Sequence, residues 1–89
     1  MKTLKQWNSK ESPSSFEQYA KPGDEIDAEL YEYFLGVLPP IYHKNGVFQV
    51  SEPFSHTSEG FATYGTYQKL GKKYFYHGNL TKKQASQKY

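Results

Sequence analysis

The sequence predicts an α+β domain in which one main helix packs on a three-stranded antiparallel β-meander. Two observations support this fold class. Apolar residues recur at helical spacing between residues 26 and 37. Three later segments are rich in Val, Thr, Tyr and Phe, which favour strands, and glycine-containing turns separate them. A chain of 89 residues holds one domain with a thin core, so helix and sheet have to share it.

The main helix is expected from residue 26 to residue 37. Ile26, Leu30 and Phe34 recur at the spacing of one helical face. Asp24 or Asp27 can cap the first turn. The two prolines at 39–40 end the helix, because proline lacks the N–H that the next turn would need. Its apolar stripe needs a sheet to cover.

The predicted strands follow the helix in the order 47–50, 61–70 and 73–77. Asn45 and Gly46 form a turn signal before the first strand. Gly71 with Lys72 makes a tight connection between the last two strands, which predicts a hairpin. The glycine-containing segment 51–60 joins the first two. Strands that are consecutive in this way form a meander.

The N-terminal residues 1–13 are polar and are expected to form a flexible arm. Trp7 is the exception, and a lone tryptophan there is expected to dock back onto its own domain rather than reach a partner. Ser14 and Glu17 have the spacing of a capping box, which predicts a short helix at the start of the domain.

The domain proper is expected to cover residues 14–80, and residues 81–89 form either a basic tail or a short helix. Thr81 and Gln84 have capping-box spacing, which favours the helix. The lysine content and polarity of the same segment favour a frayed tail equally. Both alternatives stay open.

Composition excludes several classes of protein. The chain has no cysteine, so disulfides, thiol chemistry and cysteine-ligated zinc are excluded. The first ten residues lack the apolar region of a signal peptide, and no apolar run approaches the roughly 20 residues that span a bilayer. We therefore expect a cytoplasmic protein without a membrane partner, and no cofactor is indicated.

Charge is distributed unevenly although the net charge is only +2. Residues 24–32 carry five acids and no base, whereas six lysines and no acid occur from Lys69 to the end. Every basic residue is a lysine. Because arginine supplies the planar fork that reads guanine and clamps phosphate, its absence argues against sequence-specific DNA binding.

The segment SEPFSHTSEG, residues 51–60, gathers residue types that hydrolases use. Ser55 and His56 are neighbours, however, and in extended chain their side chains would diverge. No nucleophile elbow accompanies them. The sequence therefore predicts no catalytic residue, and the segment is interpreted as a polar connection between strands.

A metal site would need the three histidines to converge with the acids of the same segment. These candidates are His43, His56, His77, Glu52 and Glu59. They show none of the short spacings typical of metal motifs. We expect three separate histidines and no metal.

Aromatic residues are the main candidates for binding. Nine Tyr, six Phe and one Trp are more than so small a core is expected to hold, so several tyrosines should be exposed. Alternation places Tyr74 and Tyr76 on one face of their strand and Phe75 on the other. If Phe75 faces the helix, both tyrosines face outward. The candidate protein-binding residues are Tyr64, Tyr67, Tyr74 and Tyr76.

The same region offers an alternative, because rings beside cations suit single-stranded nucleic acid. The candidate residues for that function are Lys69, Lys72, Lys73, Lys82 and Lys83. A plainer interpretation is that lysines protect an edge strand from aggregation and tyrosines cover a thin sheet.

Residues 25–70 resemble a family of small uncharacterised bacterial proteins, a domain of unknown function that is often carried on plasmids and phages. The resemblance lies in the helix end Leu38-Pro39-Pro40, in Gly46-x-Phe48, in Glu52-Pro53-Phe54-Ser55-His56 and in the Tyr-rich strand that follows. It implies an accessory gene of a mobile element, and such products often bind a host protein or nucleic acid, for example to blunt a defence system. It implies no activity and no site residues.

Together these observations predict a small non-enzymatic binding or regulatory protein. Its expected partner is another protein, either a host protein or a second copy in a homodimer. The alternative is a weak single-stranded nucleic-acid-binding domain that uses Tyr and Lys of the C-terminal hairpin.

Overall fold

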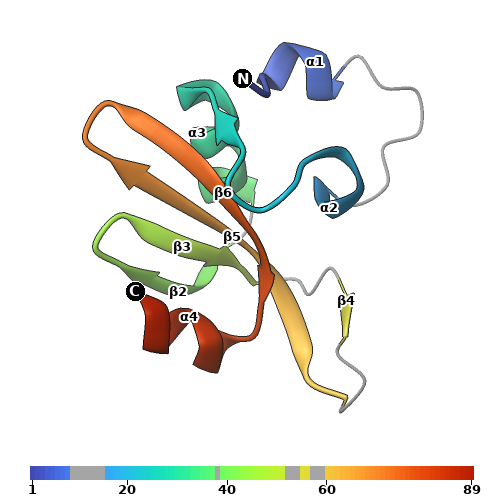
Figure 1. The fold of residues 1–89 in the computed structure, drawn as a ribbon, viewed down its shortest axis with the longest axis vertical. Helices are drawn as coiled ribbons and strands as arrows, with labels where there is room; N and C mark the ends of the chain where they lie inside the picture. Colours follow the sequence, from blue (N-terminus) through green and yellow to red (C-terminus); the bar gives the residue numbers. More distant parts are fainter. Residues whose placement is uncertain (9–15, 38, 52–54, 57–59) are drawn as a thin grey trace.

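The computed structural model describes residues 1–8, 16–37, 39–51, 55–56 and 60–89. Its centre is an antiparallel sheet with the strand order β1-β6-β5-β3-β2, and β4 pairs separately with β5. The strands are β1 (Glu25–Ile26), β2 (Pro40–Lys44), β3 (Val47–Val50), β4 (Ser55–His56), β5 (Ala62–Leu70) and β6 (Lys73–Leu80). The helices are α1 (Leu4–Asn8), α2 (Phe16–Tyr19), α3 (Ala28–Val37) and α4 (Lys82–Lys88). Helix α3 lies on one side of the sheet and α4 on the other (Figure 1).

The α+β class is confirmed, but the sheet is larger than the predicted meander. The three predicted strands are β3, β5 and β6, and β5 lies between the other two. Strand β2 was not predicted. It forms a hairpin with β3 through Asn45 and Gly46, whose φ angles of 52° and 80° are both positive, as a type I′ turn requires. Pro40 begins β2 at the edge of the sheet, a position that tolerates its missing N–H.

The main helix begins two residues later than predicted. Ile26 belongs to β1 and pairs with Tyr74 of β6, so its helical spacing to Leu30 was misleading. Asp27 caps α3 as one of the two predicted candidates, because its Oδ1 accepts a hydrogen bond from the Leu30 N–H at 2.8 Å. The same oxygen accepts from the Leu4 N–H at 3.3 Å, which ties α1 to the start of α3.

Between α3 and the sheet lies a core made largely of aromatic rings. Phe34 of α3 stacks on Tyr67 of β5, with ring centroids 4.6 Å apart and planes at 14°. Phe48 of β3 stacks on the same Tyr67 at 5.1 Å, and Phe16 meets Tyr76 edge to face at 5.0 Å. Offset and edge-to-face pairs add stabilisation beyond the apolar area that they bury. The core therefore depends on rings more than on aliphatic side chains.

Tyr76 was expected to face outward if Phe75 faced the helix, but that condition is not met and Tyr76 lies in the core. Tyr67 and Tyr76 have exposed fractions of 0%, and Tyr74 packs against the core with part of its surface exposed. Alternation along β6 does separate the tyrosines from Phe75, but the tyrosines are on the helix side. The Tyr76 hydroxyl donates to Asn79 Oδ1 at 2.7 Å, which allows a polar group to be buried there.

Residues 1–8 pack on the domain and do not form the predicted flexible arm. The Lys2 N–H donates to the Glu25 carbonyl at 2.9 Å, and Lys2 forms a parallel bridge with Ile26. The Trp7 ring lies 5.1 Å from Phe16 and packs against the core, as expected for a tryptophan that docks on its own domain. Residues 9–13, and Ser14 of the predicted first capping box, lie outside the described residues.

The C-terminal segment is a helix. Thr81 Oγ1 accepts from the Gln84 N–H at 3.0 Å, and Gln84 Oε1 accepts from the Thr81 N–H at 2.9 Å, so the predicted capping box is present. Ala85 is buried against the sheet. None of the helices in the described part of the chain is long and apolar enough to cross a membrane.

Candidate functional site

The four predicted protein-binding tyrosines do not form one surface. Tyr67 and Tyr76 are in the core, where burial and then the neighbouring Tyr76 raise the pKa of the Tyr67 hydroxyl well above its ordinary value. Tyr74 is partly buried on the α3 side, with the Lys69 ammonium 5.9 Å from its ring centroid. Tyr64 is partly buried and lines a pocket beside α4. Only Tyr64 and Tyr74 have surface to offer a partner, and they lie on different sides of the sheet.

The predicted lysines fall into two groups. Lys69, Lys72 and Lys73 lie at the tip of the β5–β6 hairpin, whereas Lys82 and Lys83 begin α4. The structure adds Lys44, which ends β2 next to the tip of the β2–β3 hairpin. We call the exposed set Lys44, Lys69, Lys72 and Lys73 the lysine tip.

The two hairpin tips are held side by side. The Lys69 N–H donates to the Gly46 carbonyl at 3.0 Å. Gly46 has a φ of 80°, and a Cβ there would lie 2.8 Å from the Lys69 carbonyl oxygen, so only glycine permits this approach. The lysine tip is therefore a feature of two hairpins in contact rather than of one mobile turn.

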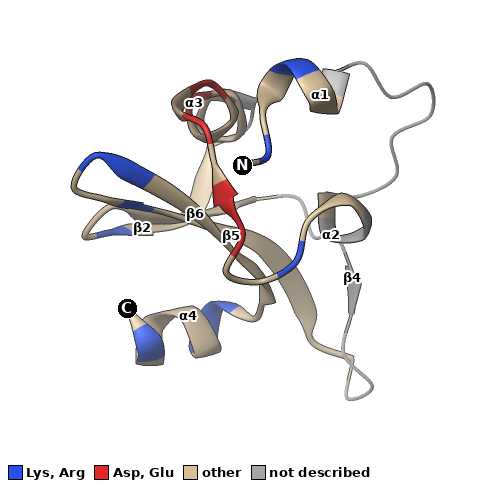
Figure 2. Cartoon of the chain, turned by 45° about the horizontal axis from the view of Figure 1, so that its top comes forward, with Lys and Arg blue, Asp and Glu red and all other residues tan. Residues whose placement is uncertain are grey.

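Negative charge lies on other elements. Figure 2 shows blue at the hairpin tips, on α4 and on α1, and red on α3 and β1. Glu29 and Glu32 are exposed on α3, and Glu25 is in β1. Leu70, which follows Lys69 of the lysine tip, is 52% exposed. This end of the molecule thus combines positive charge with an exposed apolar side chain.

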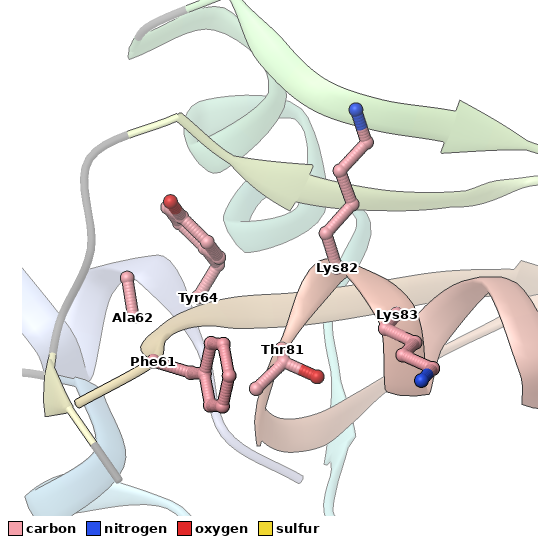
Figure 3. Close-up of a pocket in the computed structure, with 6 residues that line it drawn as sticks. All are labelled: Phe61, Ala62, Tyr64, Thr81, Lys82 and Lys83. Atoms are coloured by element: carbon pink, nitrogen blue, oxygen red, sulfur yellow. The ribbon is translucent and has the colours of Figure 1, made fainter. Parts of the chain in front are cut away.

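A pocket of about 370 Å³ lies between the start of β5 and the start of α4. Its lining residues are Phe61, Ala62, Tyr64, Thr81, Lys82 and Lys83 (Figure 3). Phe61 is a large apolar side chain with 65% of its surface exposed. Sequence reasoning missed this pocket. The available signal was a phenylalanine just after Gly60, ahead of the polar and aromatic alternation of the strand.

A layer of buried polar groups supports α4 on this side of the sheet. Gln49 of β3 is fully buried, and its Nε2 donates to Thr66 Oγ1 at 3.1 Å and to the Leu80 carbonyl at 3.0 Å. Gln49 Oε1 and the Tyr42 hydroxyl are buried without a hydrogen-bond partner among the described residues. The amide group of Gln49 therefore fastens the segment that leads into α4.

His77 has a structural role at the other end of α4. Its Nε2 lies 2.6 Å from Gln68 Oε1, and its ring stacks on Tyr89 with centroids 4.9 Å apart. Burial, and then the positive charge of Lys88, lower the pKa of His77. The lowered pKa favours the neutral imidazole, whose ring packs on Tyr89.

The segment 51–60 is described only in part. The backbones of Ser55 and His56 form β4, which pairs with Thr63 and Ala62 of β5. Their side chains, together with residues 52–54 and 57–59, lie outside the described residues, so the absence of a catalytic site there stays a prediction. In the part of the chain that is described, no three His, Cys, Asp or Glu side chains gather as ligands of a metal ion would.

No protein-family model matches the chain, and no curated protein or solved structure matches it. The resemblance of residues 25–70 to small proteins of mobile elements therefore stays a prediction.

Proposed function

We propose that this chain is a small non-enzymatic binding protein that docks through the lysine tip onto an acidic surface of another protein. The observation that carries the proposal is the convergence of exposed lysines from two hairpins whose tips are joined by the Lys69–Gly46 hydrogen bond. A fixed cluster of like charge concentrates positive potential at one end of the molecule.

Charge and apolar contact serve different purposes in such a surface. Exposed lysines raise the rate of encounter with an anionic surface and orient the approach, but each contributes little affinity. Leu70, which is exposed among them, supplies apolar area that a partner can cover. The acids of β1 and α3 lie on other elements than the lysines of the tip (Figure 2), so an acidic partner is attracted to the tip rather than to those elements. The tip is thus the favoured point of contact.

A protein partner is favoured over single-stranded nucleic acid because the expected stacking platform is largely inside the molecule. Bases stack on exposed rings, whereas Tyr67 and Tyr76 are fully buried and Tyr74 packs against the core. The lysines also lack the planar fork with which arginine holds phosphate. Binding of single-stranded nucleic acid is therefore the alternative function that the experiment below distinguishes.

A symmetric homodimer through the lysine tip is disfavoured, because a twofold interface would place the lysines of one copy against those of the other. The partner is accordingly a different protein. The family resemblance implies a host protein, as expected for an accessory factor of a mobile element.

The test compares two variants with the same change in net charge. Lys72→Glu/Lys73→Glu reverses charge at the tip, whereas Lys5→Glu/Lys21→Glu reverses charge at exposed positions away from it. Tagged wild-type protein and both variants are used to capture partners from nuclease-treated lysate of the native host. We expect a protein that the wild type and the control variant retain and that the tip variant loses.

Equal capture by the tip variant would refute the proposal. So would retention that nuclease treatment abolishes, accompanied by salt-sensitive binding of a labelled single-stranded oligonucleotide that the tip variant loses. The latter result would favour the nucleic-acid function.

A further inference from the structure

The pocket beside α4 is built from segments that are far apart in the sequence. Tyr64 pairs with Leu80 in the β5–β6 ladder, which brings the start of β5 next to the start of α4. Phe61 and Ala62 form one wall, and Thr81 with the two lysines that follow it forms the other (Figure 3).

Hydrogen bonds hold both walls of the pocket in place. Thr66 Oγ1 donates to the Tyr64 carbonyl at 3.1 Å, and Gln49 Nε2 donates to the Leu80 carbonyl. The reciprocal hydrogen bonds between Thr81 and Gln84 fix the first turn of α4. A pocket whose walls are set in this way needs little ordering when it is occupied, which favours affinity.

The lining chemistry selects an aromatic group with negative charge beside it. Phe61 and Tyr64 present ring surface, and a volume of about 370 Å³ is enough for one aromatic side chain. Lys82 and Lys83 carry the charges of the lining, and both are positive. Figure 3 shows their ammonium groups extending in different directions from the start of α4.

We infer that this pocket receives an aromatic side chain from an acidic segment of the protein partner, with carboxylates on both sides of that ring. Divergent lysines suit two separate carboxylates, whereas a single phosphate group would require donors that converge on it. Rings buried in pockets are common anchors of protein interfaces, with charged contacts around them.

The inference rests on the proposed docking function but concerns a separate surface. Strand β5 runs from the pocket to the lysine tip over nine residues. At about 3.3 Å per residue, its ends are roughly 26 Å apart, which is within the width of an ordinary protein interface. Variants at one surface therefore leave the other intact.

The test uses two peptides and NMR titration of backbone amides in the whole chain. One is acetyl-Asp-Glu-Phe-Glu-Asp-amide, and the other has Ala in place of Phe. We expect saturable shifts centred on the lining residues, with the Phe peptide binding about tenfold or more tightly than the Ala peptide. Phe61→Ala should abolish this difference between the peptides.

Matched variants separate the contributions of the ring and of the lysines to peptide binding. Leu70→Ala removes an exposed apolar side chain at the far end of β5 and should leave peptide binding unchanged. Lys82→Glu/Lys83→Glu should weaken the Phe peptide at least about tenfold, whereas Lys72→Glu/Lys73→Glu should leave it within about twofold. One combined result is peptide binding that follows this pattern while Lys72→Glu/Lys73→Glu still captures the host partner. That combination would support the pocket as a binding site and refute docking through the lysine tip.

Three results would overturn the inference. They are equal binding of the two peptides, absence of saturable shifts in the lining residues, and unchanged peptide binding by Phe61→Ala. A titration with adenosine monophosphate tests whether the pocket instead binds a nucleotide. Tighter binding of this nucleotide than of the Phe peptide, with shifts in the same residues, would identify a nucleotide site and contradict an acidic protein segment as the occupant.

Discussion

The two sides of the sheet are built in different ways. On the α3 side, Phe34, Phe48 and Tyr67 stack with almost no exposed surface. On the α4 side, Gln49 and Thr66 are buried as a hydrogen-bonded pair, and the neighbouring surface contains the pocket. Most of the tyrosines that were expected at the surface therefore stabilise the fold, and the two proposed binding features lie on the more polar side of the sheet and at the hairpin tips.

The largest expected loss of stability comes from a substitution in the core on the α3 side of the sheet. Phe48→Ala removes a ring that contacts both Tyr31 and Tyr67, and we expect it to cost about 3–5 kcal/mol in the free energy of unfolding. Phe61→Ala is the matched control, because the same side chain is 65% exposed there and its loss should cost less than about 1 kcal/mol. Urea unfolding measures both. Similar losses for the two variants would contradict the assignment of the core to the α3 side.

The next effect tests the polar layer on the α4 side. Gln49→Ala leaves the partly buried Leu80 carbonyl and the buried Thr66 hydroxyl without their amide donor, which should cost about 1–3 kcal/mol. Gln87→Ala, at an exposed position of α4, should change stability by less than about 0.5 kcal/mol. The measurement is urea unfolding combined with hydrogen exchange of the α4 amides. Unchanged exchange in Gln49→Ala would show that this side chain does not fasten α4.

A smaller effect concerns the cap of α4. Thr81→Ala removes the hydroxyl that accepts from the Gln84 N–H and should cost about 1 kcal/mol. Thr81→Ser keeps the hydroxyl and should retain most of that stability. Faster hydrogen exchange at Gln84 in the alanine variant alone would agree with the capping box. Equal exchange in the two variants would contradict it.

The smallest effect is the pH dependence that His77 contributes. Because its pKa is lowered in the folded state, folded protein binds fewer protons than unfolded protein as the pH falls below about 6.5. The contribution of His77 to the free energy of unfolding should therefore be fully present above that pH. It should decrease as the pH falls below about 6.5 and become constant below the pKa of His77 in the folded protein. His77→Gln should reduce this slope between pH 8 and 5. Equal slopes for the wild type and this variant would contradict the burial of His77 against Tyr89.

Local signals predicted those parts of the fold that depend on neighbouring residues. The capping residues Asp27 and Thr81 and the turn at Gly71 each act within a few positions, and all three are present. Strand β2 was predictable in principle, because Asn45-Gly46 is a strong hairpin signal that implies a strand on both sides. Strand β1 was not, because the spacing of Ile26 fits the helix equally well.

The candidate site could not be predicted in the same way. Its residues meet through strand register, which joins Tyr64 to Leu80 and so brings Phe61 to α4. The orientation of Tyr76 depended on which side of β6 the helix covers, and alternation alone leaves that choice open. The lysine tip required the pairing of β3 with β5, which places Gly46 against Lys69.

The central claim is that the lysine tip binds a partner and contributes little to folding. The most direct measurement determines partner retention and the free energy of unfolding on the same preparations of Lys72→Glu/Lys73→Glu and the control Lys5→Glu/Lys21→Glu. We predict that only the tip variant loses the partner, and that both variants remain within about 0.5 kcal/mol of wild-type stability. Retention of the partner by the tip variant, or loss of the partner together with unfolding, would contradict the claim.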